Sequence, residues 1–125
     1  MMYNSTVVDC FFNARHVGRL DDALPYTVCY HHAQKSQGTL VLSMQCTKNG
    51  LIEHIVYKTN GNPYLIAALE WCCRELEGAP LASLVKINYP LLIERLSIPT
   101  RHYPLAVRVV EGLKQINHLM NEKLA

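Results

Sequence analysis

The chain has 125 residues, with 12 Lys and Arg against 10 Asp and Glu, which gives a formal net charge of +2. That length accommodates one core rather than two, so the sequence predicts a single domain over residues 1–125. The charge is small and evenly spread, which argues against nucleic acid or an anionic membrane as the main partner.

The first ten residues, MMYNSTVVDC, lack the basic and apolar regions of a secretion signal, and nowhere do 18 apolar residues follow one another. We therefore expect a cytoplasmic protein without direct membrane insertion. Five cysteines with no C-x-x-C pair argue against a disulfide framework and a zinc ribbon. Charged residues make up 18% of the chain, below the roughly 25% of an average soluble domain. This favours a leftover apolar surface that binds another protein.

A first helix is predicted to start at Asn4 or Ser5, both of which are good N-caps, and to end near Asn13. It is short and must dock on other elements to persist. The apolar side that it should bury carries Val7, Val8, Phe11 and Phe12.

Alternating apolar and polar side chains predict a strand over residues 26–32, and the polar residues 32–38 predict a loop after it. The same alternation predicts a strand over residues 40–47. A hairpin turn should follow, because Asn49 and Gly50 both tolerate positive φ. The second strand should bury Leu40, Leu42, Met44 and Cys46.

The return strand, Leu51–Lys58, leads into a helix predicted over Pro63–Glu77, with Asn62 as its N-cap and Gly78 as its C-terminal stop. Three antiparallel strands therefore precede a helix. The residues expected on the buried face of that helix are Leu65, Ile66, Leu69, Cys72, Cys73 and Leu76.

Prolines near the first turn predict two short helices, over residues 80–86 and 90–96, and a long last helix that begins at Pro104. The last helix should be the longest in the chain. Its apolar stripe consists of Val109, Leu113, Ile116, Met120 and Leu124.

Asn13, Arg15 and Gly18 form an Asn-x-Arg-x-x-Gly turn after the first helix, and further similar segments lie at residues 50–61 and 98–107. With the order of elements, they resemble the NifU/IscU-type iron-sulfur cluster assembly scaffolds over nearly the whole chain. The resemblance implies an α+β fold of the IscU/SufE-like type. In it, a three-stranded antiparallel sheet packs against helices, and the C-terminal helix is long.

Members of that family hold a nascent cluster with three cysteines, helped by an aspartate, and accept sulfur from a cysteine desulfurase. The resemblance places the first cysteine and the aspartate at Ser36 and Gly38, and the second cysteine at Asn62. The histidine and the third cysteine fall at Tyr103 and Pro104. Because these residues supply no thiolate to hold iron, we expect no metal and no cofactor.

The other candidate residues do not form a metal site or a catalytic site. Cys29 and His31 can share one face of a strand, but two ligands do not close a metal site. Cys10 lies in an apolar context without a basic neighbour to lower its pKa, so it is expected in the core. His102 could serve as a base, yet no nucleophile or carboxylate can be assigned to it, and the protein is not expected to be an enzyme.

The sequence therefore predicts a non-catalytic adaptor that binds protein within a larger assembly, either a cysteine desulfurase or an unrelated complex. The family's chaperone-binding loop falls on residues 97–101 and matches only in Pro99 and Arg101. The alternative is a divergent iron-sulfur or sulfur-relay scaffold that uses another thiol, from Cys10, Cys29, Cys46, Cys72 or Cys73. The predicted protein-binding residues are Asn62, Pro63, Tyr64, Pro99, Arg101, His102 and Tyr103.

Overall fold

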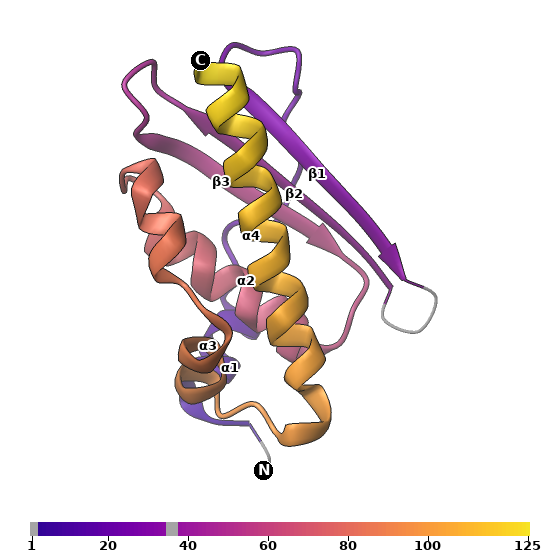
Figure 1. The fold of residues 1–125 in the computed structure, drawn as a ribbon. Coiled ribbons are helices and arrows are strands. Elements are labelled where there is room, and N and C mark those ends of the chain that lie inside the picture. The colour runs from indigo at the N-terminus through magenta and orange to yellow at the C-terminus, as the bar shows by residue number, and fades with distance from the viewer. Residues whose placement is uncertain (1–2, 35–37) are drawn as a thin grey trace.

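A computed structural model describes residues 3–34 and 38–125. Its elements are α1 (Ser5–Phe12), β1 (Thr27–Gln34), β2 (Gly38–Cys46), β3 (Ile52–Thr59), α2 (Pro63–Leu76), η1 (Leu81–Lys86), α3 (Tyr89–Leu96), η2 (Thr100–His102) and α4 (Tyr103–Leu124). Figure 1 shows the sheet as one layer, with α4 and α2 lying across the same face and α1 and α3 beyond one end. Helix α4 packs on β1 and β2, and α2 packs on β3.

The sheet is antiparallel with strand order β1-β2-β3, as the sequence predicts. Leu42 of β2 lies between Tyr30 of β1 and Tyr57 of β3. Since side chains alternate between faces, these three residues share the helix-covered face, whereas Cys29 and His31 lie on the other face. The predicted buried face of β2 is confirmed, because Leu40, Leu42, Met44 and Cys46 are each at most 2% exposed.

The loop predicted over residues 32–38 is wrong over most of its described part. Strand β1 continues to Gln34, and β2 begins at Gly38, which pairs with Gln34. Pairing of residues 32–34 with β2 satisfies the backbone of this segment, so the exposed polar side chain of Gln34 does not oppose strand formation. The remaining residues of the predicted loop, 35–37, lie outside the described residues.

The predicted turn between β2 and β3 is present, and of its two candidate residues Gly50 has the positive φ, of 86°. The Gly50 N–H donates to the Thr47 carbonyl at 3.0 Å, and the Thr47 N–H donates to the Leu51 carbonyl at 2.8 Å. One left-handed residue therefore suffices to reverse the chain. Leu51 itself bridges to Pro80, and β3 starts one residue later, at Ile52.

Helix α1 buries Val7 of the predicted side but not Phe12, and it buries Cys10 as well. Val7 and Cys10 are each 1% exposed, whereas Phe12 is 75% exposed. Asn4 caps the helix by accepting a hydrogen bond from the Val7 N–H at 2.9 Å. The helix packs mainly on α2 and also contacts α3, and a narrow apolar stripe is enough for this docking.

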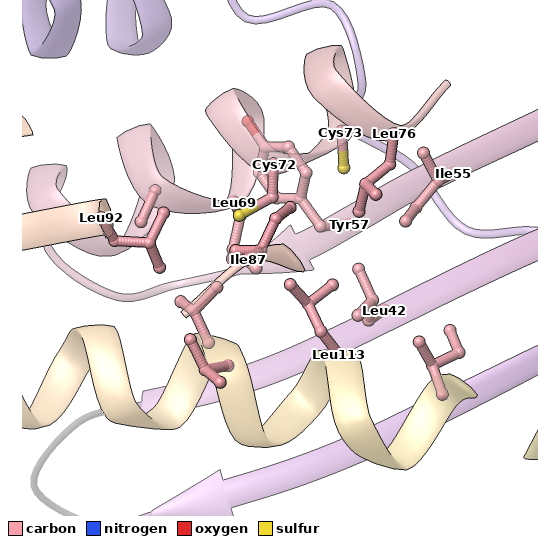
Figure 2. Packing of buried hydrophobic residues seen from close by; sticks show 14 of the residues in the cluster. Leu42, Ile55, Tyr57, Leu69, Cys72, Cys73, Leu76, Ile87, Leu92 and Leu113 are labelled. Carbon is pink, nitrogen blue, oxygen red and sulfur yellow. The ribbon is translucent and has the colours of Figure 1, made fainter. Parts of the chain in front are cut away.

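Helix α2 is enclosed on most of its circumference rather than on the single face predicted. It runs between α1, β3, α3 and α4, and even Glu70 is 0% exposed. Figure 2 shows Leu69, Cys72 and Cys73 of α2 in the core together with Tyr57 of β3 and Leu113 of α4. None of the described helices is both long enough and apolar enough to span a bilayer.

Candidate functional site

Three connections meet at the end of the sheet where α2 and α4 begin (Figure 1). They surround a pocket of about 550 Å³. Gly38 begins β2, residues 60–62 form the β3–α2 turn, Arg101 and His102 belong to η2, and Pro104 and Leu105 lie in the first turn of α4. The residues that line it are Gly38, Asn60, Gly61, Asn62, Arg101, His102, Pro104 and Leu105.

Two asparagines shape the turn side of the pocket. The Asn62 side-chain oxygen accepts a hydrogen bond from the Leu65 N–H at 3.1 Å, which makes Asn62 the N-cap of α2. The Asn60 side-chain oxygen accepts one from the Thr39 N–H at 2.7 Å, which fastens the hairpin to the turn. Gly38 has a φ of 78°, and a Cβ there would collide with the Asn60 side chain, so glycine is required.

The other side of the pocket is the short helix η2 and the first turn of α4. Here Arg101 Nε donates to His102 Nε2 at 3.4 Å. The His102 ring leans on the Tyr64 ring, with 5.2 Å between centroids, and Tyr64 contacts Tyr3 edge to face at 5.0 Å. The contacts among the Tyr3, Tyr64 and His102 rings thus hold the His102 side chain in place.

The pocket carries a positive electrostatic field. Arg101 lines it, and none of the described lining residues is acidic. The N-terminal ends of α2 and α4, where the helix dipoles are positive, both border the pocket. Arg108, which is 7% exposed, lies just behind: it donates to the Gly38 carbonyl at 2.7 Å and to His32 Nδ1 at 3.0 Å. Burial lowers the pKa of Arg108 below its ordinary value.

The structure brings five of the ten predicted site residues to this pocket. Gly38, Asn62, Arg101, His102 and Pro104 line it, whereas Ser36 lies outside the described residues. Two of the other predicted residues differ in exposure, since Tyr103 is 38% exposed and Tyr64 only 5% exposed. Those whose side chains do not line the pocket are Pro63, Tyr64, Pro99 and Tyr103.

A second polar cluster, centred on Glu70, escaped sequence reasoning. Glu70 Oε1 accepts hydrogen bonds from the N–H groups of Arg15 and His16, both at 3.1 Å, and from the Tyr57 hydroxyl at 3.2 Å. Its Oε2 pairs with His16 Nδ1 at 2.8 Å and with Arg74 Nε at 2.9 Å. An acid with a base four residues later is typical of an exposed helix face, so the pattern gave no sign of burial.

Burial by itself raises the pKa of Glu70, but hydrogen bonds from the His16 and Arg74 side chains and from the backbone of His16 and Arg15 outweigh it. The net effect lowers the pKa below its ordinary value. The Glu70 cluster also fixes the position of the Asn-x-Arg-x-x-Gly turn, because Glu70 accepts hydrogen bonds from the Arg15 and His16 N–H groups. The His16 carbonyl and the Gly18 N–H bond to the backbone of Tyr57 at 2.9 and 2.8 Å, which covers part of the β3 edge.

A model of the NifU-like N-terminal domain matches residues 2–118 of the sequence. The chain belongs to this family. Iron sulfur cluster assembly protein 2, mitochondrial, of Saccharomyces cerevisiae is 29% identical over 100 residues, which cover 78% of this chain and 64% of that protein. The iron-sulfur cluster assembly scaffold protein IscU of Aquifex aeolicus is 29% identical over 94 residues, which cover 75% of this chain and 59% of that protein. The chain thus spans about six tenths of the length of these relatives.

Solved structures confirm the α+β fold of this NifU-like domain. A hypothetical protein superposes with a TM-score of 0.71 at 14% identity, over 91% of this chain and 95% of that one. The N-terminal part of a nitrogen-fixing NifU-like protein from Brucella abortus superposes with a TM-score of 0.59 at 14% identity, over 92% of this chain and 80% of that one. They share the three-stranded antiparallel sheet and the long C-terminal helix expected from the sequence.

The cysteines of this NifU-like domain lie away from the pocket, and among the described residues no cysteine lines it. All five are free; four are buried, and burial raises the pKa of each, that of Cys46 to about 11. Cys29 is half-buried on the opposite face of the sheet, with its Sγ 3.3 Å from Ser43 Oγ. Its strand neighbour His31 bonds instead to Arg19 at 3.1 Å.

Nowhere in residues 3–34 and 38–125 do three His, Cys, Asp or Glu side chains converge in a way that could hold a metal ion. The pocket instead offers amide, imidazole and guanidinium nitrogens. An iron-sulfur cluster, the cargo of this family's scaffolds, is held by thiolates, so the described lining does not fit it.

Proposed function

We propose that this chain is a non-catalytic adaptor, built as one NifU/IscU-like domain over residues 1–125, that binds protein within a larger assembly and has lost the cluster ligands. The observation that carries the proposal is the lining of the pocket. Where the resemblance places sulfur ligands, the described chain has Asn62 and Pro104, and no thiol lines the space between them. Asn62 and Pro63 are accounted for by the start of α2.

The binding face is the pocket with the exposed first turns of α4. Tyr103 and Val107 are 38% and 48% exposed, and Pro104 between them is exposed as well. Tyrosine gives a large contact area at low entropic cost, and low charge suits the core of an interface. The partner is either a cysteine desulfurase, which the family meets, or an unrelated complex that has recruited the fold.

Anaerobic reconstitution with iron and sulfide tests the loss of ligands, with the Aquifex aeolicus relative as positive control. We expect no stoichiometric iron and no cluster absorbance. Stoichiometric uptake would overturn the proposal and favour the alternative, a divergent iron-sulfur or sulfur-relay scaffold. The first ligand to test would then be Cys29, since Cys10 and Cys46 are buried.

The protein contact is tested with the intact chain as bait in a quantitative comparison. Tyr103→Ala should reduce the recovery of the specific partner at least fivefold, because aromatic residues dominate interface energies. Val85→Ala is the matched control: Val85 is 73% exposed on η1 and does not line the pocket. Equal recovery by both variants would remove the binding function from this face.

A further inference from the structure

The side chains of the described pocket residues are rich in free hydrogen-bond donors and poor in free acceptors. The side-chain oxygens of Asn60 and Asn62 already accept bonds from Thr39 and Leu65, which leaves both amide NH₂ groups without a partner among the described residues. His102 Nε2 accepts from Arg101, so Nδ1 carries the ring proton. Within the same described residues, both terminal nitrogens of Arg101 remain available.

Donors in excess need acceptors, and an arginine fork suits a planar or tetrahedral oxyanion. Guanidinium groups bind carboxylate and phosphate through two parallel hydrogen bonds, which are stronger than neutral ones. None of the described lining residues is acidic, so nothing in the lining competes for Arg101 as a counter-ion. The surrounding positive charge of Arg108 adds to the attraction.

The size and lining of the pocket restrict the ligand further. Its volume of about 550 Å³ lies in the range for small organic ligands and is far larger than an inorganic ion needs. Leu105, at the start of α4, is 5% exposed and gives the lining an apolar surface next to Pro104. A ligand that fills the space therefore has an apolar body as well as a charged end.

We propose that this pocket binds an organic oxyanion, a carboxylate or phosphate carried on an apolar body, with Arg101 and the side-chain amides of Asn60 and Asn62 as its donors. The inference rests on the proposed function, because it assigns a ligand chemistry to the same face. The anion has two sources: a free small molecule, or an acidic side chain of the protein partner.

NMR titration of the intact ¹⁵N-labelled chain tests the proposal. The probes are phenyl phosphate, which has both parts, inorganic phosphate, which has only the anion, and phenol, which has only the apolar body. We expect saturable shifts at Arg101 Nε–H, at the Asn60 and Asn62 side-chain amides and at the Leu105 N–H. Phenyl phosphate should bind at least tenfold more tightly than either fragment.

A capped peptide with glutamate beside leucine, and its glutamine counterpart, separate the two sources. Tighter binding of the glutamate peptide than of phenyl phosphate assigns the pocket to a partner's acidic side chain; the reverse order assigns it to a free small molecule. The glutamine peptide should bind at least tenfold more weakly than the glutamate peptide, because it lacks the charge that Arg101 recognises.

Two variants identify the donors without disturbing the fold. Arg101→Gln should weaken binding at least tenfold, whereas Arg95→Gln, which removes an exposed charge on α3, should leave it unchanged. Asn62→Ser should weaken binding a fewfold while keeping the helix cap, since serine caps as well as asparagine. Equal affinity of Arg101→Gln and the wild type, shifts on another surface, or no saturation in the millimolar range would overturn the proposal.

Failure here is distinguishable from failure of the adaptor function. Absence of anion binding would leave the reconstitution result and the effect of Tyr103→Ala as they are. Iron uptake, conversely, would overturn the loss of ligands without changing the titration.

Discussion

Two polar regions among the described residues differ in charge pairing, in exposure and in how many of their hydrogen-bonding groups have partners. Around Glu70, acids and bases are matched, the carboxylate is 0% exposed, and its oxygens accept five hydrogen bonds. Around Arg101 the donors outnumber the acceptors and the space is open. A saturated cluster has nothing left to offer a ligand, whereas an unsaturated one does. From this comparison we expect the first region to stabilise the fold and the second to bind a ligand.

The largest effect is expected from Glu70→Gln, which keeps the side-chain size but removes the charge that pairs with His16 and Arg74. Leaving buried partners uncompensated should reduce the free energy of unfolding by about 3–5 kcal/mol. Urea unfolding followed by circular dichroism measures it. Glu75→Gln, at an exposed position of the same helix, should change it by no more than about 0.5 kcal/mol. Similar values for both variants would mean that the Glu70 cluster is not structural.

Acid should weaken the first region through Glu70. The pKa of Glu70 is lower in the folded protein than its ordinary value, so its contribution to stability is present above the unfolded pKa of about 4.3. That contribution is lost as the pH falls through the lower, folded pKa. The pKa of Asp9 is also lowered, by hydrogen bonds from Asn13 and Arg74, but Asp9 is present in the wild type and in Glu70→Gln alike.

Urea unfolding at a series of pH values from 7 down to about 3 therefore isolates Glu70, within the range where an ordinary Glu titrates. The wild type should lose stability more steeply than Glu70→Gln below the unfolded pKa. Parallel curves for the two proteins are the contrary result, and they would show that Glu70 is not ionised in the folded state.

A smaller effect is expected at the boundary of the pocket, where Asn62 caps α2. Asn62→Ala should cost about 1 kcal/mol of unfolding free energy, because the Leu65 N–H loses its acceptor. Thermal unfolding compares it with Asn62→Ser, which should stay close to the wild type. A loss in Asn62→Ser as large as in Asn62→Ala would point to a structural role beyond the cap.

The smallest effect on stability is expected from Arg101→Gln, the variant that should abolish most anion binding. Arg101 is exposed and its recorded hydrogen bond, to His102, is long, so unfolding should change by no more than about 0.5 kcal/mol. The same urea titration measures it. A loss comparable to that of Glu70→Gln would show that Arg101 supports the fold, and the contrast between the two regions would disappear.

Local signals in the sequence predicted the fold well and the site in part. The caps Asn4 and Asn62 and the left-handed Gly78 end or start helices where predicted, because capping depends on neighbours within a few residues. The resemblance named Gly38, Asn62 and Pro104 as the positions of family ligands, and in the structure these three residues line one pocket. Polar composition failed at residues 32–34, where pairing with β2 makes a strand of an apparent loop.

What the sequence determined by itself is the set of elements and their order, since hydrophobic period, turn residues and caps act over short range. What only the tertiary structure decided is which polar residues are enclosed and which face an opening. Glu70 and Arg101 are both single charged residues in the sequence, but α1, β3 and the residue 13–18 turn enclose Glu70, whereas Arg101 lines an open pocket between three connections. Burial depends on residues far away in the chain, and a buried charge must find partners within the fold, whereas an exposed one is free to bind a ligand.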